Sequence, residues 1–521
     1  MPVGGQDGSA GATLDCWPRE IDGDSFMLIR PVLLLLTVLM CVVTSGQAAT
    51  GPKELAEKLN TDRSVQGSDE EKAWPVLVEY LQSLPPMPDG AMAPINEIWP
   101  GMVNEIWPGM DGWPQAAAWA SQQDGLAEAV SDASGRLKLG LAYGRSAVAP
   151  ESLSAGLFID LGQDDVVARP KFPYLKAFDR LAQWIAVESN RLIEEGKVEE
   201  GVDLLIDGIF IMRLVSDREF LDEKSWGMQR LIDLLEVLRD VMYRNTDNIS
   251  AELLNRISLK DMPAIRPDRA RLFIPEHDRL VCQVFLENAF HEVHGGDSRD
   301  FPRIYTDLQA RSEPLSRFGA RRRWESLYEG HDSLKSSLER LDHVYDDWWR
   351  RWRVNPQSDM GKVILAELSQ FETINPARFA AMLVAIRDMQ GLFELRDDLV
   401  FEVNAAATSA GLAAYLVDRG VYPNEMRMTY GISTSKAFDQ DIHDPDFSAF
   451  KYRVRDQRNP VDVGTIRVWI EPGTGLLYSV GRDGFDGIAE RHLAVDSDGD
   501  LIIWPPPDTL VRLQSASSPE K

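Results

Sequence analysis

Between Lys171 and about Asp398, apolar side chains recur every three or four residues, as in helices that bury one face. The clearest run contains Leu175, Phe178, Leu181, Trp184, Ile185 and Leu192. The polar, glycine-containing segment 195–201 then turns the chain into a second apolar run, 202–214, which predicts a helical hairpin. Further helices are expected at 226–238, 280–289, 334–352 and 363–368. A chain with this pattern must pack helix against helix.

These helix pairs resemble tetratricopeptide hairpins in size, but the small residues of that family do not recur at its repeat length. We therefore predict an irregular helical domain at 156–398. Beyond it, Ala405 to Tyr415 is predicted to be helical, and runs such as 465–470 and 501–504 have the composition of strands. The expected fold class is mainly α, with an irregular helical array followed by a small α+β module at 399–510. That module should contain a helix and an antiparallel sheet, and residues 511–521 should form a disordered tail.

The N-terminal 48 residues have the pattern of a secretory signal. The apolar run 31–43 is followed by the small residues Gly46 and Ala48, so cleavage is expected to leave Ala49 as the first residue. The run is shorter than the roughly 20 residues that cross a bilayer. An uncleaved anchor is the alternative, and it is the one route to membrane association that we expect. The protein is therefore predicted to be exported to the periplasm or cell envelope.

Residues 1–26 do not belong to a signal, because they carry five acidic side chains and a single arginine. Met27, followed by Arg30, is a better start, so residues 1–26 are interpreted as a mis-assigned extension. Cys41 raises the possibility of a lipoprotein. Met40 stands where lipidation of Cys41 needs a small residue, and so we do not favour a lipoprotein.

The segment 49–155 is predicted to be mixed, with helices at 52–59 and 73–81 and a repeat in which NEIWPGM occurs twice from Asn96 onward. Each Pro-Gly pair imposes a turn. A period of eight residues is too short for a solenoid unit, which needs roughly 20. Trp99 and Trp107 are therefore expected to pack against their own domain, and contact with a partner is the alternative.

Charge and cysteine content exclude several classes of protein. The formal net charge is −27 at pH 7, so the chain should repel nucleic acid. Removal of the signal also removes Cys16 and Cys41 and leaves Cys282 alone. The exported chain can then form no internal disulfide, even in an oxidising compartment.

A group of carboxylates near the C-terminus has the composition of a calcium site. Five aspartates fall within two short glycine-containing segments, 477–487 and 496–500: Asp483, Asp486, Asp496, Asp498 and Asp500. Carboxylates repel one another unless a cation joins them, and Ca²⁺ accepts six to eight oxygens. An EF-hand is excluded, because Leu501 and Pro507 stand where its loop needs glycine and glutamate. The alternative is that these Asp-Gly pairs only form hairpin turns.

The order of motifs in this region resembles the C-terminal part of the major pseudopilin of type II secretion. The resemblance is carried by segments 412–423, 444–447, 452–453, 477–484 and 499–500. It implies a helix that leads into a three-stranded sheet, with calcium beside the Leu-Tyr-Ser-x-Gly-x-Asp-Gly loop. The implied ligands are the carbonyls of Val480 and Phe485 and the side chains of Asp483 and Asp500, with Asp498 as a further candidate.

The chain departs from pseudopilins in one respect, because the pilin-like part is C-terminal and does not follow the leader. As a whole, it is more similar to an uncharacterised family of bacterial envelope proteins. Those proteins place a helical domain, with an element such as Ala73-Trp-Pro75 near its start, before such a module. This resemblance implies no activity.

Three other patterns have structural alternatives. His291, His294 and Asp297 resemble part of a zinc helix, but the histidines are three positions apart, not four, and a helix end is favoured. The segment 346–353 mixes tryptophans and arginines as interfacial helices do. We favour core packing of Trp348 and Trp352. Cys282 lies in an apolar helix and is expected to be packed, not reactive.

Two hypotheses of function follow. The first is an exported, non-catalytic envelope protein whose helical domain binds a protein partner and whose pilin-like tail is stiffened by calcium. The second is a secreted hydrolase with an acidic active site that has no recognisable motif.

Overall fold

The structure is a computed structural model, and it describes residues 50–88, 107–163, 166–266, 272–291, 330–354, 358–463, 466–492 and 499–517. All of these residues belong to one compact unit that begins at Thr50. The predicted leader, the extension 1–26 and the first NEIWPGM copy lie outside them. The predicted fold class is confirmed, since the unit is mainly helical with small sheets near its C-terminus.

The N-terminal part contains five helices and a hairpin among its described elements: α2 (Pro52–Leu59), α3 (Trp74–Ser83), α4 (Trp113–Ala120), α5 (Leu126–Ser134), α6 (Pro150–Ser154), β1 (Asp160–Gln163) and β2 (Val166–Lys171). The predictions at 52–59 and 73–81 are confirmed. Trp107, in the second repeat copy, is half-buried, and the guanidinium of Arg512 lies 5.4 Å from its ring centroid. Trp107 thus contacts its own chain through Arg512, whereas packing against its own N-terminal segment stays a prediction.

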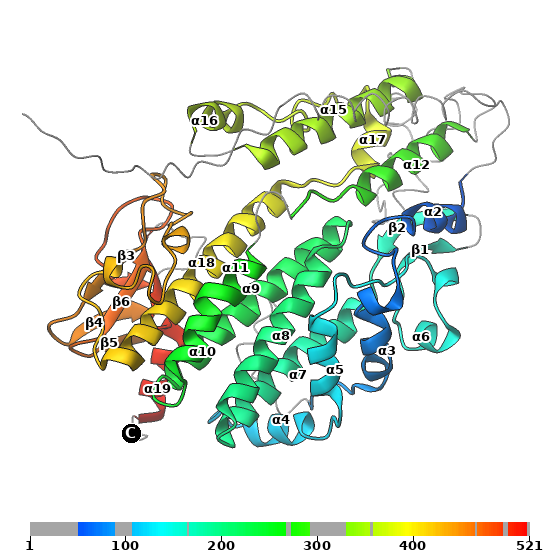
Figure 1. Cartoon of the computed structure of the whole chain (residues 1–521). Coiled ribbons are helices and arrows are strands. Elements are labelled where there is room, and N and C mark those ends of the chain that lie inside the picture. Colours follow the sequence, from blue (N-terminus) through cyan, green and yellow to red (C-terminus); the bar gives the residue numbers. More distant parts are fainter. Residues whose placement is uncertain are drawn as a thin grey trace, which may run out of the picture. The chain divides into compact units, whose positions relative to one another are not determined.

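The central part is an array of long helices: α7 (Leu175–Glu194), α8 (Val198–Ser216), α9 (Leu221–Arg244), α10 (Ala251–Arg256), a π-helical turn (Ile257–Asp261), α11 (Met262–Ile265), α12 (His277–His291), α15 (Leu334–Arg353), α16 (Asp359–Ala366), α17 (Ala380–Ala385) and α18 (Gln390–Arg419). The predicted hairpin is α7 and α8, which lie side by side with α9 in Figure 1. Gly208 permits the close approach of α7 and α8, because a Cβ there would meet Ile185 at 2.7 Å.

The C-terminal part contains two small sheets and a last helix: β3 (Lys451–Val454), β4 (Asn459–Val463), β5 (Ile466–Ile470), β6 (Gly475–Ser479), β7 (Arg491–His492), β8 (Leu501–Trp504) and α19 (Pro507–Ser517). One sheet is antiparallel with order β3-β6-β8. The other has order β5-β4-β7, in which β4 pairs with β5 antiparallel and with β7 parallel. The strands predicted at 465–470 and 501–504 are β5 and β8.

The last helix differs from the prediction. Residues 511–517 were expected to be disordered, but they continue α19. Leu510 of this helix is buried, and Gln514 exchanges two hydrogen bonds with the backbone of Trp469, at 3.1 and 2.9 Å. The segment is ordered because it covers the edge strand β5, which the polar sequence after residue 511 does not reveal.

The hydrophobic core joins the helical array to the C-terminal sheets. One cluster of buried side chains extends from Leu55 in α2 to Trp504 in β8. The boundary predicted at residue 398 falls inside α18, whose small residues between Ala405 and Ala414 are buried. Arg239 of α9 reinforces this junction, because it donates to the Ile503 carbonyl at 3.1 Å and to Glu402 at 2.8 Å.

In the part of the chain that the structure describes, one helical stretch, Ala380–Arg419, is long and apolar enough to cross a membrane. Inside the protein, 78% of its most apolar window is buried. A core helix of a soluble protein passes the same test, and α18 has the burial of such a helix.

Candidate functional site

The loop that follows β6 brings the two predicted parts of the calcium site together. Val480 is buried, and its N–H donates to the Asp441 carboxylate at 3.3 Å. At Gly481, with φ of +70°, a Cβ would lie 2.0 Å from the Gly499 carbonyl oxygen. The loop and the chain that enters β8 therefore meet, backbone against backbone, which only glycine at 481 allows.

Asp500 points back into this loop. Its side chain is buried, and its two carboxylate oxygens accept from the N–H groups of Gly487 at 3.3 Å and Ala489 at 2.6 Å. Burial raises the pKa of Asp500, the two backbone donors oppose that shift, and the charges of Asp486 and Asp483 add to it. Asp500 thus lies close enough to Asp486 and to Asp483 to be repelled by the charge of each.

Asp483 and Phe485 occupy the exposed side of the loop. The Asp483 carboxylate accepts from the Phe485 N–H at 3.0 Å, and the Phe485 carbonyl accepts from the Gly487 N–H at 3.0 Å. The Phe485 ring is 71% exposed. Asp486 accepts from the Tyr478 hydroxyl at 2.9 Å and from the Ile488 N–H at 2.9 Å. The Asp483 carboxylate and the Phe485 carbonyl retain lone pairs that a cation is able to use, whereas both bonds to Asp486 end on its Oδ1 and leave only the second oxygen for a cation.

Four of the five predicted calcium ligands are thus placed in one loop system, and Asp498 lies outside the described residues. Within the described ranges, no three side chains of His, Cys, Asp or Glu form a group that could hold a metal ion. The predicted set has only two described carboxylates, with carbonyl oxygens as the others. The donors fit calcium in their chemistry, and calcium binding stays a prediction.

Asp441 supports the loop, and sequence reasoning missed it. Its side chain is only 1% exposed and accepts from the N–H groups of His443 at 3.1 Å, Asp444 at 3.3 Å and Val480. Burial raises the pKa of Asp441 to about 6. The run Asp441-Ile-His-Asp-Pro-Asp446 has the composition of consecutive turns, in which aspartates accept from the backbone two residues on. That composition was the sequence signal from which the role of Asp441 in a turn could have been predicted.

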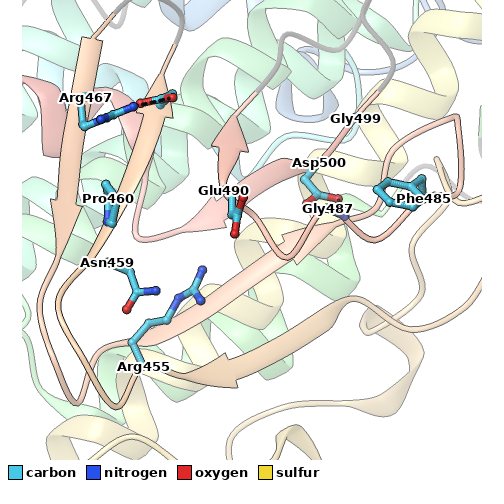
Figure 2. A pocket seen from close by; sticks show the side chains of 10 residues that line it. Arg455, Asn459, Pro460, Arg467, Phe485, Gly487, Glu490, Gly499 and Asp500 are labelled. Carbon is cyan, nitrogen blue, oxygen red and sulfur yellow. Dashed lines mark hydrogen bonds and ion pairs between the residues drawn. The ribbon is translucent and has the colours of Figure 1, made fainter.

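A hollow of about 680 Å³ adjoins the loop. It is lined by Arg455, Asn459, Pro460, Asp462, Arg467, Phe485, Gly487, Glu490, Gly499 and Asp500. Figure 2 shows Asn459, Pro460 and Arg467 on one side and Phe485, Gly487 and Asp500 on the other. Arg467 is paired with Asp462. Arg455 enters from the end of β3. The sequence did not indicate this hollow, because its walls come from four separate segments.

The other patterns in the sequence have structural roles where they are described. Trp348 and Trp352 are buried, which confirms their core packing, and Trp352 donates to the Leu272 carbonyl at 2.7 Å. Cys282 is buried as predicted, and burial raises its thiol pKa. His294 and Asp297 lie outside the described residues, so the prediction of a helix end there stays a prediction.

A buried polar network lies in the helical region. The Glu223 carboxylate accepts from Arg218 at 3.1 Å, from Tyr174 at 2.6 Å and from Tyr143 at 3.4 Å. Both members of the ion pair are 0% exposed. The tyrosine hydroxyls and the arginine compensate the buried carboxylate, so the arrangement serves packing.

In comparisons with known proteins, no family model, curated protein or solved structure matches the chain. The likeness to pseudopilins and to an envelope family therefore stays an expectation from the sequence motifs.

Proposed function

We propose that this chain is an exported, non-catalytic protein of the cell envelope. Its helical region binds another protein, and calcium stiffens its C-terminal module. The compact unit begins at Thr50, next to the predicted cleavage site, which is what a removable leader requires. Protein from the envelope fraction should begin at or near Ala49 on N-terminal sequencing. A soluble cytoplasmic product that retains residues 1–26 would contradict the export.

The observation that carries partner binding is the surface of α16. In and just after this helix, four apolar side chains are exposed: Met360 by 67%, Val363 by 57%, Leu365 by 41% and Leu368 by 70%. Fully burying such a side chain contributes about 1.5–3 kcal/mol. Clustered exposed apolar residues mark interaction sites more often than scattered ones. This exposed apolar surface of α16 and the residue that follows it therefore supports a protein partner on the helical region.

The test compares two variants for co-isolation of a partner from the envelope. Met360→Glu with Leu368→Glu should abolish co-isolation, because charge replaces the apolar contact while the exposed positions leave folding intact. Leu137→Glu is the matched control, since Leu137 is 74% exposed and lies outside α16. Equal recovery of the same partner with both variants would show that α16 is not the binding face.

The calcium part of the proposal is supported by the charges of Asp483 and Asp486, each of which acts on the buried carboxylate of Asp500. A bound cation would relieve their repulsion, and binding would stabilise the fold by about 2.7 kcal/mol at a hundredfold excess over Kd. The protein should melt higher in calcium than in chelator. Magnesium should substitute poorly, because it requires tighter octahedral geometry and keeps its waters.

Variants separate the ligand role of each aspartate from its structural role. Asp483→Ala should abolish the calcium response and leave melting in chelator almost unchanged, since among the described residues the Asp483 carboxylate accepts a hydrogen bond only from the exposed Phe485 N–H. Asp500→Ala should also lower melting in chelator, because two backbone donors lose their acceptor. Asp456→Asn, an exposed turn residue, is the control. If the wild-type protein melts at the same temperature in calcium and in chelator, the calcium proposal is wrong and the Asp-Gly pairs only form turns.

A further inference from the structure

Arg455 is a buried arginine with unused hydrogen-bonding capacity. Its side chain is only 8% exposed, and one of its terminal nitrogens donates to the Ile488 carbonyl at 2.9 Å. Its Nε has no hydrogen-bond partner among the described residues. A guanidinium has five N–H donors, and leaving them unpaired in a buried site is costly.

Within the described part of the chain, Arg455 also forms no close ion pair, although the charge of Glu490 reaches it over a longer distance. Four other arginines of this module have carboxylate partners: Arg453 with Asp486, Arg458 with Glu471, Arg467 with Asp462 and Arg482 with Asp398. Arg455 belongs to none of these pairs. Burial lowers its pKa and the neighbouring charge of Arg453 lowers it further, whereas Tyr478 and the charge of Glu490 oppose these shifts without cancelling them. Both effects are relieved if an anion binds at Arg455.

The hollow places this arginine where a ligand is able to reach it. Figure 2 shows Arg455 directed into the hollow between the side chains of Asn459 and Glu490, with Phe485 at the far rim. Asn459 adds an amide donor beside the guanidinium. Phe485 and Pro460 add apolar surface, and Phe485 is the most exposed aromatic ring among the large exposed hydrophobic side chains described.

The remaining charges restrict the kind of anion. Arg467 is neutralised by Asp462 at 2.7 Å, and Glu490 and Asp500 leave two carboxylates on the lining. A dianion such as phosphate would be repelled by these groups, whereas a single carboxylate matches the flat, two-donor edge of a guanidinium.

We propose that the hollow beside β4 binds a ligand with one carboxylate and an apolar body, held by Arg455 and Asn459 and covered by Phe485. The carboxylate belongs either to a small organic acid or to the C-terminus of a peptide. None of the predicted calcium ligands supplies the carboxylate-binding donors. Phe485 and Asp500 belong both to this lining and to the predicted calcium site, so binding is measured in chelator, where it does not depend on calcium.

The test is calorimetric titration of the purified protein in chelator. N-acetyl-phenylalanine represents the small acid, and a short peptide ending in phenylalanine represents the chain end. The matched controls are the amides of both, inorganic phosphate and acetate. We expect at least one free carboxylate ligand to bind, and its amide to bind at least about tenfold more weakly, as loss of a charge-assisted hydrogen bond predicts. Phosphate should not compete. The carboxylate ligand that binds with the higher affinity shows whether the natural ligand is a small organic acid or the C-terminus of a peptide.

Three variants assign the binding to this hollow. Arg455→Met should weaken binding at least about tenfold. Phe485→Ala should weaken the aromatic ligands without changing acetate, and it tests the site even if Arg455→Met fails to fold, because Phe485 is exposed. Arg458→Met, an exposed arginine outside the lining, should bind as wild type. The proposal is overturned if neither carboxylate binds, if the amides bind equally well, or if Phe485→Ala leaves the affinity for the aromatic ligands unchanged.

Discussion

At the scale of single residues, the 441–444 turn contains two buried groups whose titrations oppose each other. Asp441 has its pKa raised by burial to about 6, above its ordinary value near 4. His443, 6% exposed, has its pKa lowered to about 4, mainly by burial and then by the charge of Arg482. Asp398 faces His443 at 3.5 Å. The folded protein thus binds a proton at Asp441 that the unfolded chain has lost, and lacks one at His443 that the unfolded chain holds.

The signs of the two contributions follow from linkage. Between pH about 4 and 6, folded Asp441 holds more protons than unfolded Asp441, so its contribution to stability falls as pH rises. Between pH about 4 and 6.5, folded His443 holds fewer protons than unfolded His443, so its contribution is lost as pH falls. Between pH about 4 and 6, the pH dependences of stability that Asp441 and His443 contribute therefore have opposite signs and largely cancel.

Substituting one of the two residues should therefore reveal the pH dependence of stability that the other contributes. Relative to wild type, Asp441→Asn should gain stability as pH rises from 4 to 6, and His443→Gln should lose it. The change across the interval should be on the order of 2 kcal/mol in each case, at 1.36 kcal/mol per pKa unit. Urea unfolding at several pH values measures it. Parallel curves for wild type and both variants would contradict the assignment.

At the scale of elements, α19 holds the C-terminal sheets to α9. Thr509 and Arg512 donate to the two carboxylate oxygens of Asp240, at 2.6 and 3.0 Å. Asp240 is 7% exposed, and burial raises its pKa. On its other side, Gln514 pairs with the backbone of Trp469 and occupies the hydrogen-bonding edge of β5. The helix thus satisfies a buried acid and a sheet edge together.

Truncation after Pro506 should cost at least about 3–5 kcal/mol, because it leaves the Asp240 carboxylate buried without its two side-chain donors from α19. Urea unfolding gives this value. Asp240→Asn provides the control: it should destabilise the full chain but recover stability in the truncated one, where the charge has lost its partners. An Asp240→Asn effect of the same sign in both backgrounds would show that α19 does not act through this carboxylate.

At the scale of the whole molecule, the shared core makes the C-terminal module part of the helical array. The interior of α18 packs against α9 and α10 in Figure 1, and Trp504 of β8 lies edge-on to Tyr243 of α9, with ring centroids 5.1 Å apart. Removing either part would expose apolar surface of the other. By contrast, α16 has a single buried residue, Gly361.

Hydrogen exchange should show this coupling. Backbone amides of α9, β6 and β8 should exchange with similar opening free energies, since these elements lose their shared core together. Amides of α16 should exchange at a lower free energy. If β6 and β8 open at a clearly lower free energy than α9, the module is a separate folding unit. The prediction of a separate C-terminal domain from the sequence would then be correct.

The amino-acid sequence by itself determined the elements whose signal is local. The spacing of apolar residues identified α7, α8, α9, α12 and α15, because a helix that buries one face repeats that face along its own length. Alternating or continuous apolar runs bounded by turn residues likewise identified β5 and β8. For the same reason, the clustered Asp-Gly pairs located the loop that now carries Asp483 and Asp500.

Only the tertiary structure decided what depends on contacts between distant segments. Without its contacts to Asp240 and Trp469, the α19 sequence has the composition of a tail. Arg455 is an ordinary strand-end arginine until Asn459, Glu490 and the other described lining residues surround it. Asp441 is one more turn aspartate until Val480 donates to it. Burial, pKa and unpaired charge are properties of the surroundings, and residues far apart in the chain create those surroundings.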